Sequence, residues 1–197
     1  RPAQVALCHQ MLNAMLEGGI ALCDAGTGIG KTYAYLAAGT VYHRFRAASG
    51  FPVQPILIST SSIALQTAAR DEYLPLLSSL LAEDGMITQP LQAVIRKGKS
   101  HYVCDDRLER RLGQLDLRKK NWRAGNALLA LRNELDMDEI AHLSHYDRER
   151  VCVPQICNCS QETCRYRFFL EKCDSGRYLF QICNHNLLLA DAIHRGS

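Results

Sequence analysis

Apolar residues along the chain form two kinds of pattern, helix-like stripes and short continuous runs. The stripe at 2–16 has one apolar face and ends at Gly18-Gly19, which predicts an N-terminal helix. Short runs such as 55–60 are typical of fully buried strands in a parallel sheet. The predicted strands cover 20–23, 55–60, 91–95 and 180–185, and further helices are predicted at 31–46, 62–73, 107–142, 165–170 and from 187.

Strands that alternate with helices, interrupted by an irregular segment, predict an α/β fold with a small inserted lobe. We place the first part of the main domain at 1–95, the inserted lobe at 96–176 and the return to the main domain at 177–197. A chain of 197 residues can bury one good core and carry a smaller appended lobe. No apolar run reaches the length of a membrane span, so we expect no membrane partner.

A glycine-rich loop at 24–32 follows the apolar run 20–23 and opens into the predicted helix at 31–46. Three glycines let backbone N–H groups converge on phosphate oxygens, and the helix N-terminus adds positive potential. In such a loop Lys31 and Thr32 are the catalytic residues: the ammonium reaches the outer phosphates and the hydroxyl holds Mg²⁺. The predicted nucleotide-binding residues of the loop are Ala25, Gly26, Thr27, Gly28, Ile29, Gly30, Lys31 and Thr32.

Ala25 stands where the general phosphate-loop pattern has glycine, and we interpret this as a variant. The competing interpretation is a glycine-rich turn with a chance Lys-Thr pair. A strand before the loop and a helix after it favour nucleotide binding.

Nine cysteines are the second notable feature, and six of them fall between 152 and 183. A secreted disulfide scaffold is normally small and would not carry a nucleotide loop. Zinc ribbons contain Cys-x2-Cys pairs, and this chain has none. Irregular spacing with one remote member, Cys104, suits an iron–sulfur cluster with four cysteine ligands.

The net charge of +3 is too small to indicate nucleic-acid binding, but its distribution is uneven. From 96 to 132 there are eleven Lys or Arg residues against four acids. Such a stretch can neutralise phosphates, although a solvated helix face is the commoner explanation of a charge run.

Taken in order, these motifs resemble the DinG and XPD group of superfamily 2 iron–sulfur helicases, with DinG the more similar member. The segment 1–4 resembles the adenine-contacting segment, and 24–32 resembles motif I. The segment 59–66 is similar to motif Ia, which contacts DNA in that family. The run 97–104 resembles the one that ends in the first cluster ligand, and 184–191 resembles the Asn-His segment that follows the cluster.

The resemblance implies a RecA-like P-loop sheet with an inserted helical iron–sulfur lobe, and ATP-driven 5′-to-3′ translocation on DNA. Its implied cofactors are ATP, Mg²⁺ and a [4Fe-4S] cluster. The implied adenine contact is Gln4, and the implied DNA contacts are Thr60, Ser61 and Gln66. The implied cluster ligands are Cys104, Cys152, Cys157 and Cys164, with Cys159 as the alternative to Cys157.

The same resemblance predicts single-stranded or forked DNA as the partner, inside the bacterial cytoplasm. Some DinG-like helicases accompany type IV CRISPR systems, so a CRISPR ribonucleoprotein or another DNA-processing partner is also an expectation.

The Asp-Glu-x-His box that such helicases need is missing. Neither Asp71-Glu72 nor Asp138-Glu139 follows an apolar strand. The chain therefore resembles the N-terminal part of a helicase and is not expected to unwind DNA alone. The alternative hypothesis is a metal-cluster DNA-binding module with a vestigial loop. A small-molecule kinase would not explain the cysteines.

Overall fold

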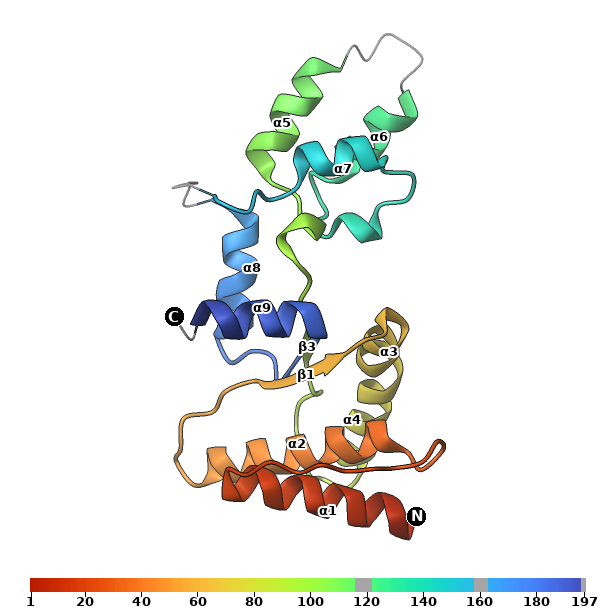
Figure 1. The fold of residues 1–197 in the computed structure, drawn as a ribbon, viewed down its shortest axis with the longest axis vertical. Helices are drawn as coiled ribbons and strands as arrows, with labels where there is room; N and C mark the ends of the chain where they lie inside the picture. Colours follow the sequence, from red (N-terminus) through yellow and green to blue (C-terminus); the bar gives the residue numbers. More distant parts are fainter. Residues whose placement is uncertain (116–121, 158–162, 196–197) are drawn as a thin grey trace. The chain divides into compact units, whose positions relative to one another are not determined.

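The computed structural model describes residues 1–115, 122–157 and 163–195. The chain divides into two compact units, and each is described by itself (Figure 1). Unit 1 comprises Arg1–Arg96 and Cys173–Ser197, and unit 2 comprises Lys97–Lys172. Unit 2 is thus an insertion in the sequence of unit 1.

Among the described residues of unit 1, three parallel strands form one sheet. They are β1 (Ile56–Thr60), β2 (Ala93–Ile95) and β3 (Phe180–Asn184), in the spatial order β1-β3-β2. The central strand comes from the end of the chain, and Phe180 lies beside Ile56 on one side and Ala93 on the other. The prediction of an α/β fold with a parallel sheet is confirmed.

Helices cover both faces of this sheet. They are α2 (Lys31–Ala48), α3 (Ile63–Ala68), α4 (Leu74–Glu83) and α9 (His185–Arg195), while α1 (Pro2–Glu17) packs against α2. Figure 1 shows α2 and α4 on one side of the sheet and α9 on the other. The core between α2, α4 and the sheet consists of Leu36, Leu74, Leu77 and Phe180. A Cβ atom at Gly39 would come within 2.8 Å of the Phe180 ring, so the small residue lets α2 approach the sheet.

Two predicted elements of unit 1 are wrong. The run 20–23 is not a strand: Ile20 is 93% exposed and Leu22 is 96% exposed. A strand needs a hydrogen-bonded neighbour, and no described strand pairs with this segment.

The helix predicted to close at 71–75 instead continues. A π-turn, η1 (Ala69–Tyr73), joins α3 to α4, and Pro75 lies in the first turn of α4. The proline is tolerated because the hydrogen-bonding pattern changes from π to α at this point, so its missing N–H does not interrupt a regular α-helical ladder.

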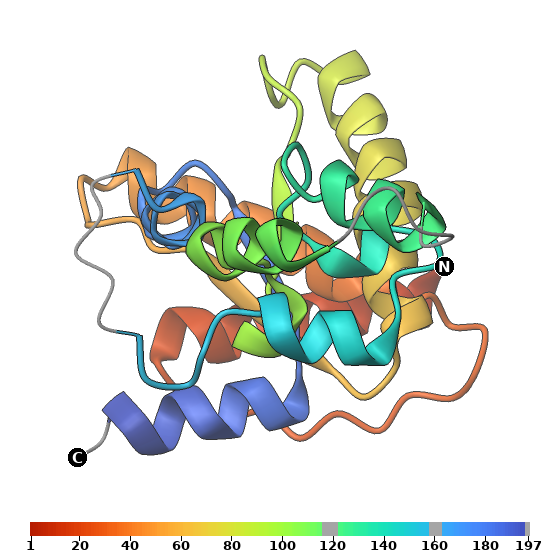
Figure 2. The ribbon, with the colours of Figure 1, turned by 90° about the horizontal axis from the view of Figure 1, so that it is seen from above.

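Unit 2 is helical, as expected for 107–142, but its helices are short. They are α5 (Asp105–Gln114), α6 (Trp122–Ala130), α7 (His145–Val151) and α8 (Arg165–Asp174), with the 3₁₀ turns η2 (Lys99–His101) and η3 (Met137–Glu139). Figure 2 shows α5 and α7 side by side. Their shared core contains Val103, Leu108, Leu112, Leu128, Leu131, Met137 and Val151.

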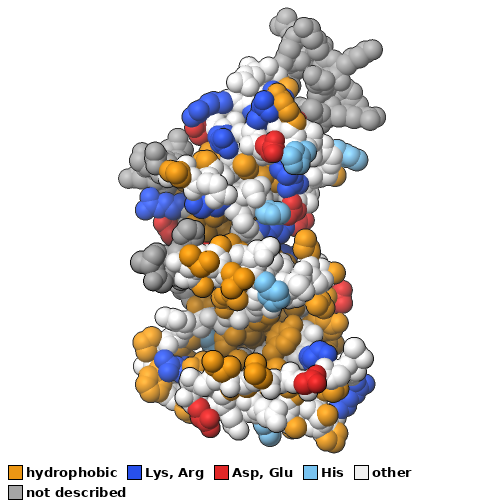
Figure 3. All heavy atoms as spheres, in the orientation of Figure 1, with side chains coloured by type: hydrophobic (Ala, Val, Ile, Leu, Met, Phe, Trp, Pro, Cys, Tyr) orange, Lys and Arg blue, Asp and Glu red, His pale blue; other side chains and the backbone are white. Residues whose placement is uncertain are grey.

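The surfaces of the two units differ in composition. On the face shown in Figure 3, hydrophobic side chains gather over unit 1, whereas charged side chains and histidines stand close together over unit 2. Unit 1 exposes apolar side chains at several of its elements, including Leu57 of β1 and Leu189 of α9.

Candidate functional site

The glycine loop forms the connection between α1 and α2. Gly28 has φ 78° and Gly30 has φ 90°, a left-handed conformation that side chains other than glycine rarely adopt. Gly30 is also the residue on which α2 begins, because its carbonyl oxygen accepts the first helical hydrogen bond from Ala34 N at 3.1 Å. The two glycines therefore turn the chain from the extended segment 19–26 into the helix.

Side chains of Gln4 in α1 and of Arg1 just before α1 contact the loop. Gln4 Nε2 donates to the Gly30 carbonyl oxygen at 3.0 Å, and Arg1 Nη1 donates to the Gly28 carbonyl oxygen at 2.8 Å. The structure thus places Gln4, the predicted adenine contact, directly against the predicted phosphate loop. The adenine contact itself stays a prediction.

Lys31 folds back over the loop that precedes it. Its Nζ donates to the carbonyl oxygens of Ala25 at 2.8 Å and Gly26 at 2.9 Å. Lys31 is exposed, so these two oxygens and water are the groups that a phosphate would have to displace. Thr27 and Gly28 lie at the exposed tip of the loop, and Ile29 is half-buried.

Thr32, the predicted Mg²⁺ residue, lies in the first turn of α2. Burial raises the pKa of the Tyr35 hydroxyl, and a hydrogen bond with the Thr32 side chain opposes this shift. The Thr32 hydroxyl is therefore oriented by a neighbour one helical turn away.

The three predicted DNA contacts do not share one surface. Thr60 ends β1, and its hydroxyl accepts a hydrogen bond from Ser62 N at 3.3 Å. Ser61 is exposed, whereas Gln66 in α3 is 4% exposed. Among the described residues, Gln66 Nε2 has no hydrogen-bond partner.

A further contact links the predicted DNA-contacting segment 59–66 to the Asn-His segment 184–191. Ser59 Oγ lies 2.7 Å from His185 Nδ1, and Asn184 Oδ1 accepts a hydrogen bond from Leu187 N at 2.7 Å to cap α9. Sequence reasoning could not pair Ser59 with His185, because the pairing depends on the register of β1 against β3. The capping role of Asn184 does have a sequence signal, since asparagine is a preferred N-terminal cap.

Backbone pairing brings two predicted cluster ligands together. Val103 and Cys152 form an antiparallel bridge, and Cys104 N donates to the Val151 carbonyl oxygen at 2.8 Å. Cys104 stands at the start of α5 and Cys152 at the end of α7. Burial raises the pKa of the Cys104 thiol, while backbone N–H groups of α5 oppose this and the nearby Cys157 adds to it.

Cys164 is linked to Cys104 through neighbouring residues. Arg165, next to Cys164, forms an ion pair with Asp105, next to Cys104, with Nε 2.8 Å from Oδ1. Tyr102 is 2% exposed and packs between Tyr166 and Phe169, with ring centroids 5.2 and 5.0 Å away. The start of α8 is thereby fastened to the segment that leads into Cys104.

The donor chemistry of these residues suits an iron–sulfur cluster, but the four sulfurs do not converge. Cys104, Cys152, Cys157 and Cys164 are free thiols, and thiolates are the preferred ligands of such clusters. Among the described residues, no group of three or more Cys, His, Asp or Glu side chains is arranged to hold a metal ion. Cys159, the alternative ligand, lies outside the described residues.

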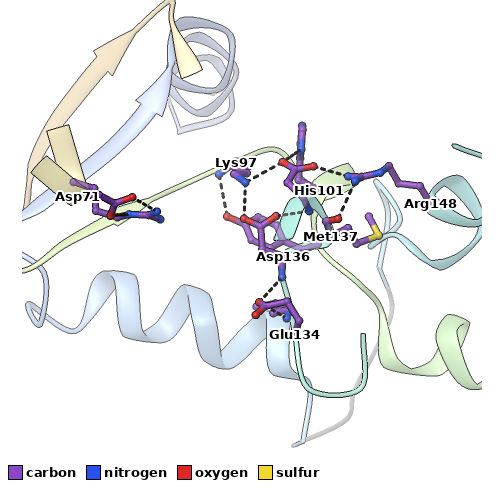
Figure 4. A network of polar contacts seen from close by, with 11 residues as sticks. Asp71, Lys97, His101, Glu134, Asp136, Met137 and Arg148 are labelled. Atoms are coloured by element: carbon purple, nitrogen blue, oxygen red, sulfur yellow. Dashed lines mark hydrogen bonds and ion pairs between the residues drawn. The ribbon is translucent and has the colours of Figure 1, made fainter. Parts of the chain in front are cut away.

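A polar network that sequence reasoning missed anchors the segment before Cys104 (Figure 4). Lys97 Nζ lies 2.5 Å from Asp136 and 2.9 Å from Asp138, which also accepts from His101 Nδ1 at 2.9 Å and Arg148 Nη1 at 2.6 Å. Burial alone would raise the pKa of Asp138, but hydrogen bonds from Lys97, His101 and Arg148 outweigh it and hold the pKa well below its usual range. Burial would lower the pKa of Lys97, but its two carboxylate partners raise it.

The basic stretch 96–132 is balanced by carboxylates over much of its described part. The ion pairs are Arg96–Asp191, Lys97–Asp136, Lys97–Asp138, Arg110–Asp106, Arg111–Asp147 and Arg132–Glu109. Carboxylate pairing therefore accounts for these residues, but the Arg111–Asp147 pair is largely buried, so a solvated helix face does not describe all of them. Residues 116–121 of the stretch lie outside the described part.

The sheet and the loop define a parallel α/β protein with a glycine-rich loop at the start of α2. Comparison with known proteins narrows this class. The chain is 35% identical over 109 residues to the ATP-dependent DNA helicase YoaA of Escherichia coli K12. The aligned stretch covers 55% of this chain and 15% of the relative. The chain is 30% identical over 116 residues to a Bacillus subtilis protein named 3′-5′ exonuclease DinG, covering 59% of this chain and 11% of that one.

A third relative is the ATP-dependent DNA helicase DinG of Photobacterium profundum, 33% identical over 86 residues, or 44% of this chain and 11% of the relative. The chain thus spans only a small part of the length of these proteins. No family model matches it. The resemblance to DinG-type helicases predicted from the motifs is confirmed. None of these names refers to CRISPR, and that expected partner has no support.

One further observation concerns the helices. None that the structure describes is both long and apolar enough to cross a bilayer.

Proposed function

We propose that this chain is the ATP-binding part of a DinG-like, ATP-dependent DNA helicase motor. The observation that carries the proposal is the contact between Gln4 and Gly30, at 3.0 Å, because it brings together two segments that resemble separate helicase motifs. Similarity to proteins named DNA helicases supports the same conclusion.

In this proposal Lys31 exchanges its two loop carbonyls for the outer phosphates of ATP, and Thr32 holds Mg²⁺. Gln4 contacts adenine from α1. The segment around Thr60 and Ser61, at the carboxyl end of β1, contacts one DNA strand, since ligands of parallel sheets bind beyond this edge. Hydrolysis in the intact RecA-like motor drives 5′-to-3′ movement and unwinding.

Unit 2 is proposed to be the iron–sulfur lobe. Cys104, Cys152, Cys164 and either Cys157 or Cys159 would hold a [4Fe-4S] cluster. When bound, the cluster supplies a rigid cross-link between chain segments that the fold already brings near one another. Its proposed use is as a wedge where the duplex parts.

The test is ATP hydrolysis by the full-length protein that contains this chain. Lys31→Ala is expected to lower DNA-stimulated ATPase activity at least about 100-fold, the scale seen when a preorganised electrostatic contact is removed. Arg70→Ala is the matched control, because it removes a cation of unit 1 that pairs with its neighbour Asp71 at 2.6 Å. Turnover that survives Lys31→Ala would contradict the motor proposal. DNA binding without ATPase activity in the unaltered protein would favour a metal-cluster DNA-binding module.

A further inference from the structure

Arg107 differs from the other arginines of α5 in what it contacts. It lies in the first turn of the helix and is half-buried. Its Nη1 donates to the Cys152 carbonyl oxygen at 2.8 Å and lies 3.8 Å from the Cys152 sulfur. One side chain of α5 thus contacts the carbonyl oxygen and the sulfur of a predicted cluster ligand that is 45 positions away.

The neighbouring arginines of α5 have carboxylate partners, Asp106 for Arg110 and Asp147 for Arg111. Arg107 has no carboxylate partner among the described residues. A half-buried cation is unfavourable unless acceptors or an anion balance it. The ionisable acceptor beside Arg107 is the Cys152 sulfur, which becomes an anion when cysteine ligates a metal.

As a free thiol, Cys152 can donate its proton to a different acceptor. Its Sγ lies 3.4 Å from the Glu149 carbonyl oxygen, one turn earlier in α7, and can donate a weak hydrogen bond there. A sulfur that ligates a metal can only accept hydrogen bonds, and Arg107 Nη1 is a donor that already lies 3.8 Å from it.

We propose that Arg107 is a positioning residue of the iron–sulfur site, where it fixes Cys152 through its carbonyl oxygen and donates a hydrogen bond to its ligating sulfur. The inference rests on the proposed cluster in unit 2. The bond to the carbonyl oxygen also ties the end of α7 to the start of α5, and therefore holds Cys152 next to Cys104. Donors to ligand sulfurs offset negative charge at a cluster, so they favour its reduced state and raise its reduction potential.

The experiment uses this chain, reconstituted anaerobically with iron and sulfide. Three variants are compared with the unaltered chain: Arg107→Gln, Arg107→Lys and the control Arg110→Gln. The control removes an arginine from the same helix whose side chain is 71% exposed. Bound iron and sulfide, the midpoint potential from an EPR-monitored titration, the rate of iron loss to a chelator and thermal unfolding are measured for each.

Arg107→Gln is expected to bind the cluster at a lower midpoint potential and to release iron about tenfold faster, as typical for partners that orient metal ligands. Arg107→Lys should lie in between, because an ammonium keeps the charge but lacks the planar pair of donors. Arg110→Gln should match the unaltered chain in potential.

Two results would overturn the inference in different ways. A loaded Arg107→Gln chain with the potential and iron retention of the unaltered chain would remove the role of Arg107 and leave the cluster proposal intact. An unaltered chain that takes up no iron would instead remove the cluster proposal, and the role of Arg107 with it. An Arg107→Gln chain with lowered thermal stability but an unmoved potential belongs with the first result, because it would show a purely structural role.

Discussion

The glycine loop and the cysteine region differ in how far apart in the chain their parts lie. The loop is a contiguous segment, and its remote contact, Gln4, comes from the helix just before it. The cysteine region draws its predicted ligands from segments that start α5, end α7 and precede α8. The loop is closed by its own side chains, whereas the four described cysteine sulfurs do not converge.

The difference follows from the entropy of loop closure and from the partners that the polar groups of each site require. A short loop closes at little entropic cost, and Lys31 finds carbonyl oxygens within it. Remote segments must first be held by a core and by ion pairs such as Arg165–Asp105. In the proposed function, metal binding then supplies the remaining free energy that draws the sulfurs together.

The largest expected effect tests whether the cores of the two units unfold independently. Phe180→Ala should destabilise unit 1 by about 3–5 kcal/mol, and Leu128→Ala should destabilise unit 2 by about 2–5 kcal/mol, because each removes a fully buried side chain. Hydrogen exchange of the whole chain should show each loss of protection confined to one unit. Loss of protection across both units from either substitution would mean that the chain unfolds as a single cooperative body.

The next effect tests whether the glycine loop is built locally. Gly30→Ala should cost about 1–3 kcal/mol, because the residue is left-handed and its added methyl would collide with the Gln4 side chain. The double variant Gln4→Ala with Gly30→Ala should recover the part of the cost that is due to the collision. Urea unfolding of the single and double variants measures the free energy of coupling between Gln4 and Gly30.

Gly98→Ala is the control for that cycle, because Gly98 has φ −64° and an added methyl would meet its nearest atoms at 4.0 Å. It should change stability little. A Gly30→Ala cost no larger than that of Gly98→Ala would show that the loop does not hold this conformation in solution.

A smaller effect concerns the charges that hold unit 2. Asp138→Asn should destabilise the chain by about 1–2 kcal/mol at neutral pH, a range that allows for solvent screening at a carboxylate with 35% of its side chain exposed. The folded state lowers the pKa of Asp138, so its stabilisation is present above about pH 4, the ordinary aspartate range, and is lost as the pH falls. The difference between the two proteins should therefore shrink in acid.

Asp106→Asn serves as the control for Asp138→Asn. Its partner Arg110 is largely exposed, so this substitution should cost no more than about 0.5 kcal/mol. Equal costs for the two substitutions would mean that the network around Asp138 is no stronger than an ordinary surface pair.

How much the sequence could predict depends on the range of the interactions. The parallel strands at 56–60, 93–95 and 180–184 are short apolar runs, and local pattern was sufficient to find them. The glycine loop was equally visible, since its chemistry lies in consecutive residues. Pro75 misled because proline marks either the end of a helix or its first turn, and only the structure decides which.

The contacts that sequence reasoning missed all join distant positions. Lys97 meets Asp138, Ser59 meets His185, and Arg107 meets Cys152. In each case nothing in the local spacing of the residues marks a partner. Only the folding of the core around them brings the pairs together.

The smallest expected effect addresses the segment before the glycine loop, where the sequence pattern and the structure disagree. Alternate residues Ile20 and Leu22 are apolar, yet Leu22 is 96% exposed. If the segment stands free in solution as it does here, Leu22→Ser should change the free energy of unfolding of this chain by no more than about 0.5 kcal/mol. The matched leucine is Leu36 of α2, which is 0% exposed and should cost about 2–5 kcal/mol when replaced by alanine. A loss of unfolding free energy in Leu22→Ser that approaches the loss in Leu36→Ala would show that 20–23 is buried after all. The glycine loop would then depend on the sheet, as the cysteine region depends on its core. A negligible cost would leave the loop as a site that forms from its own residues, α1 and α2.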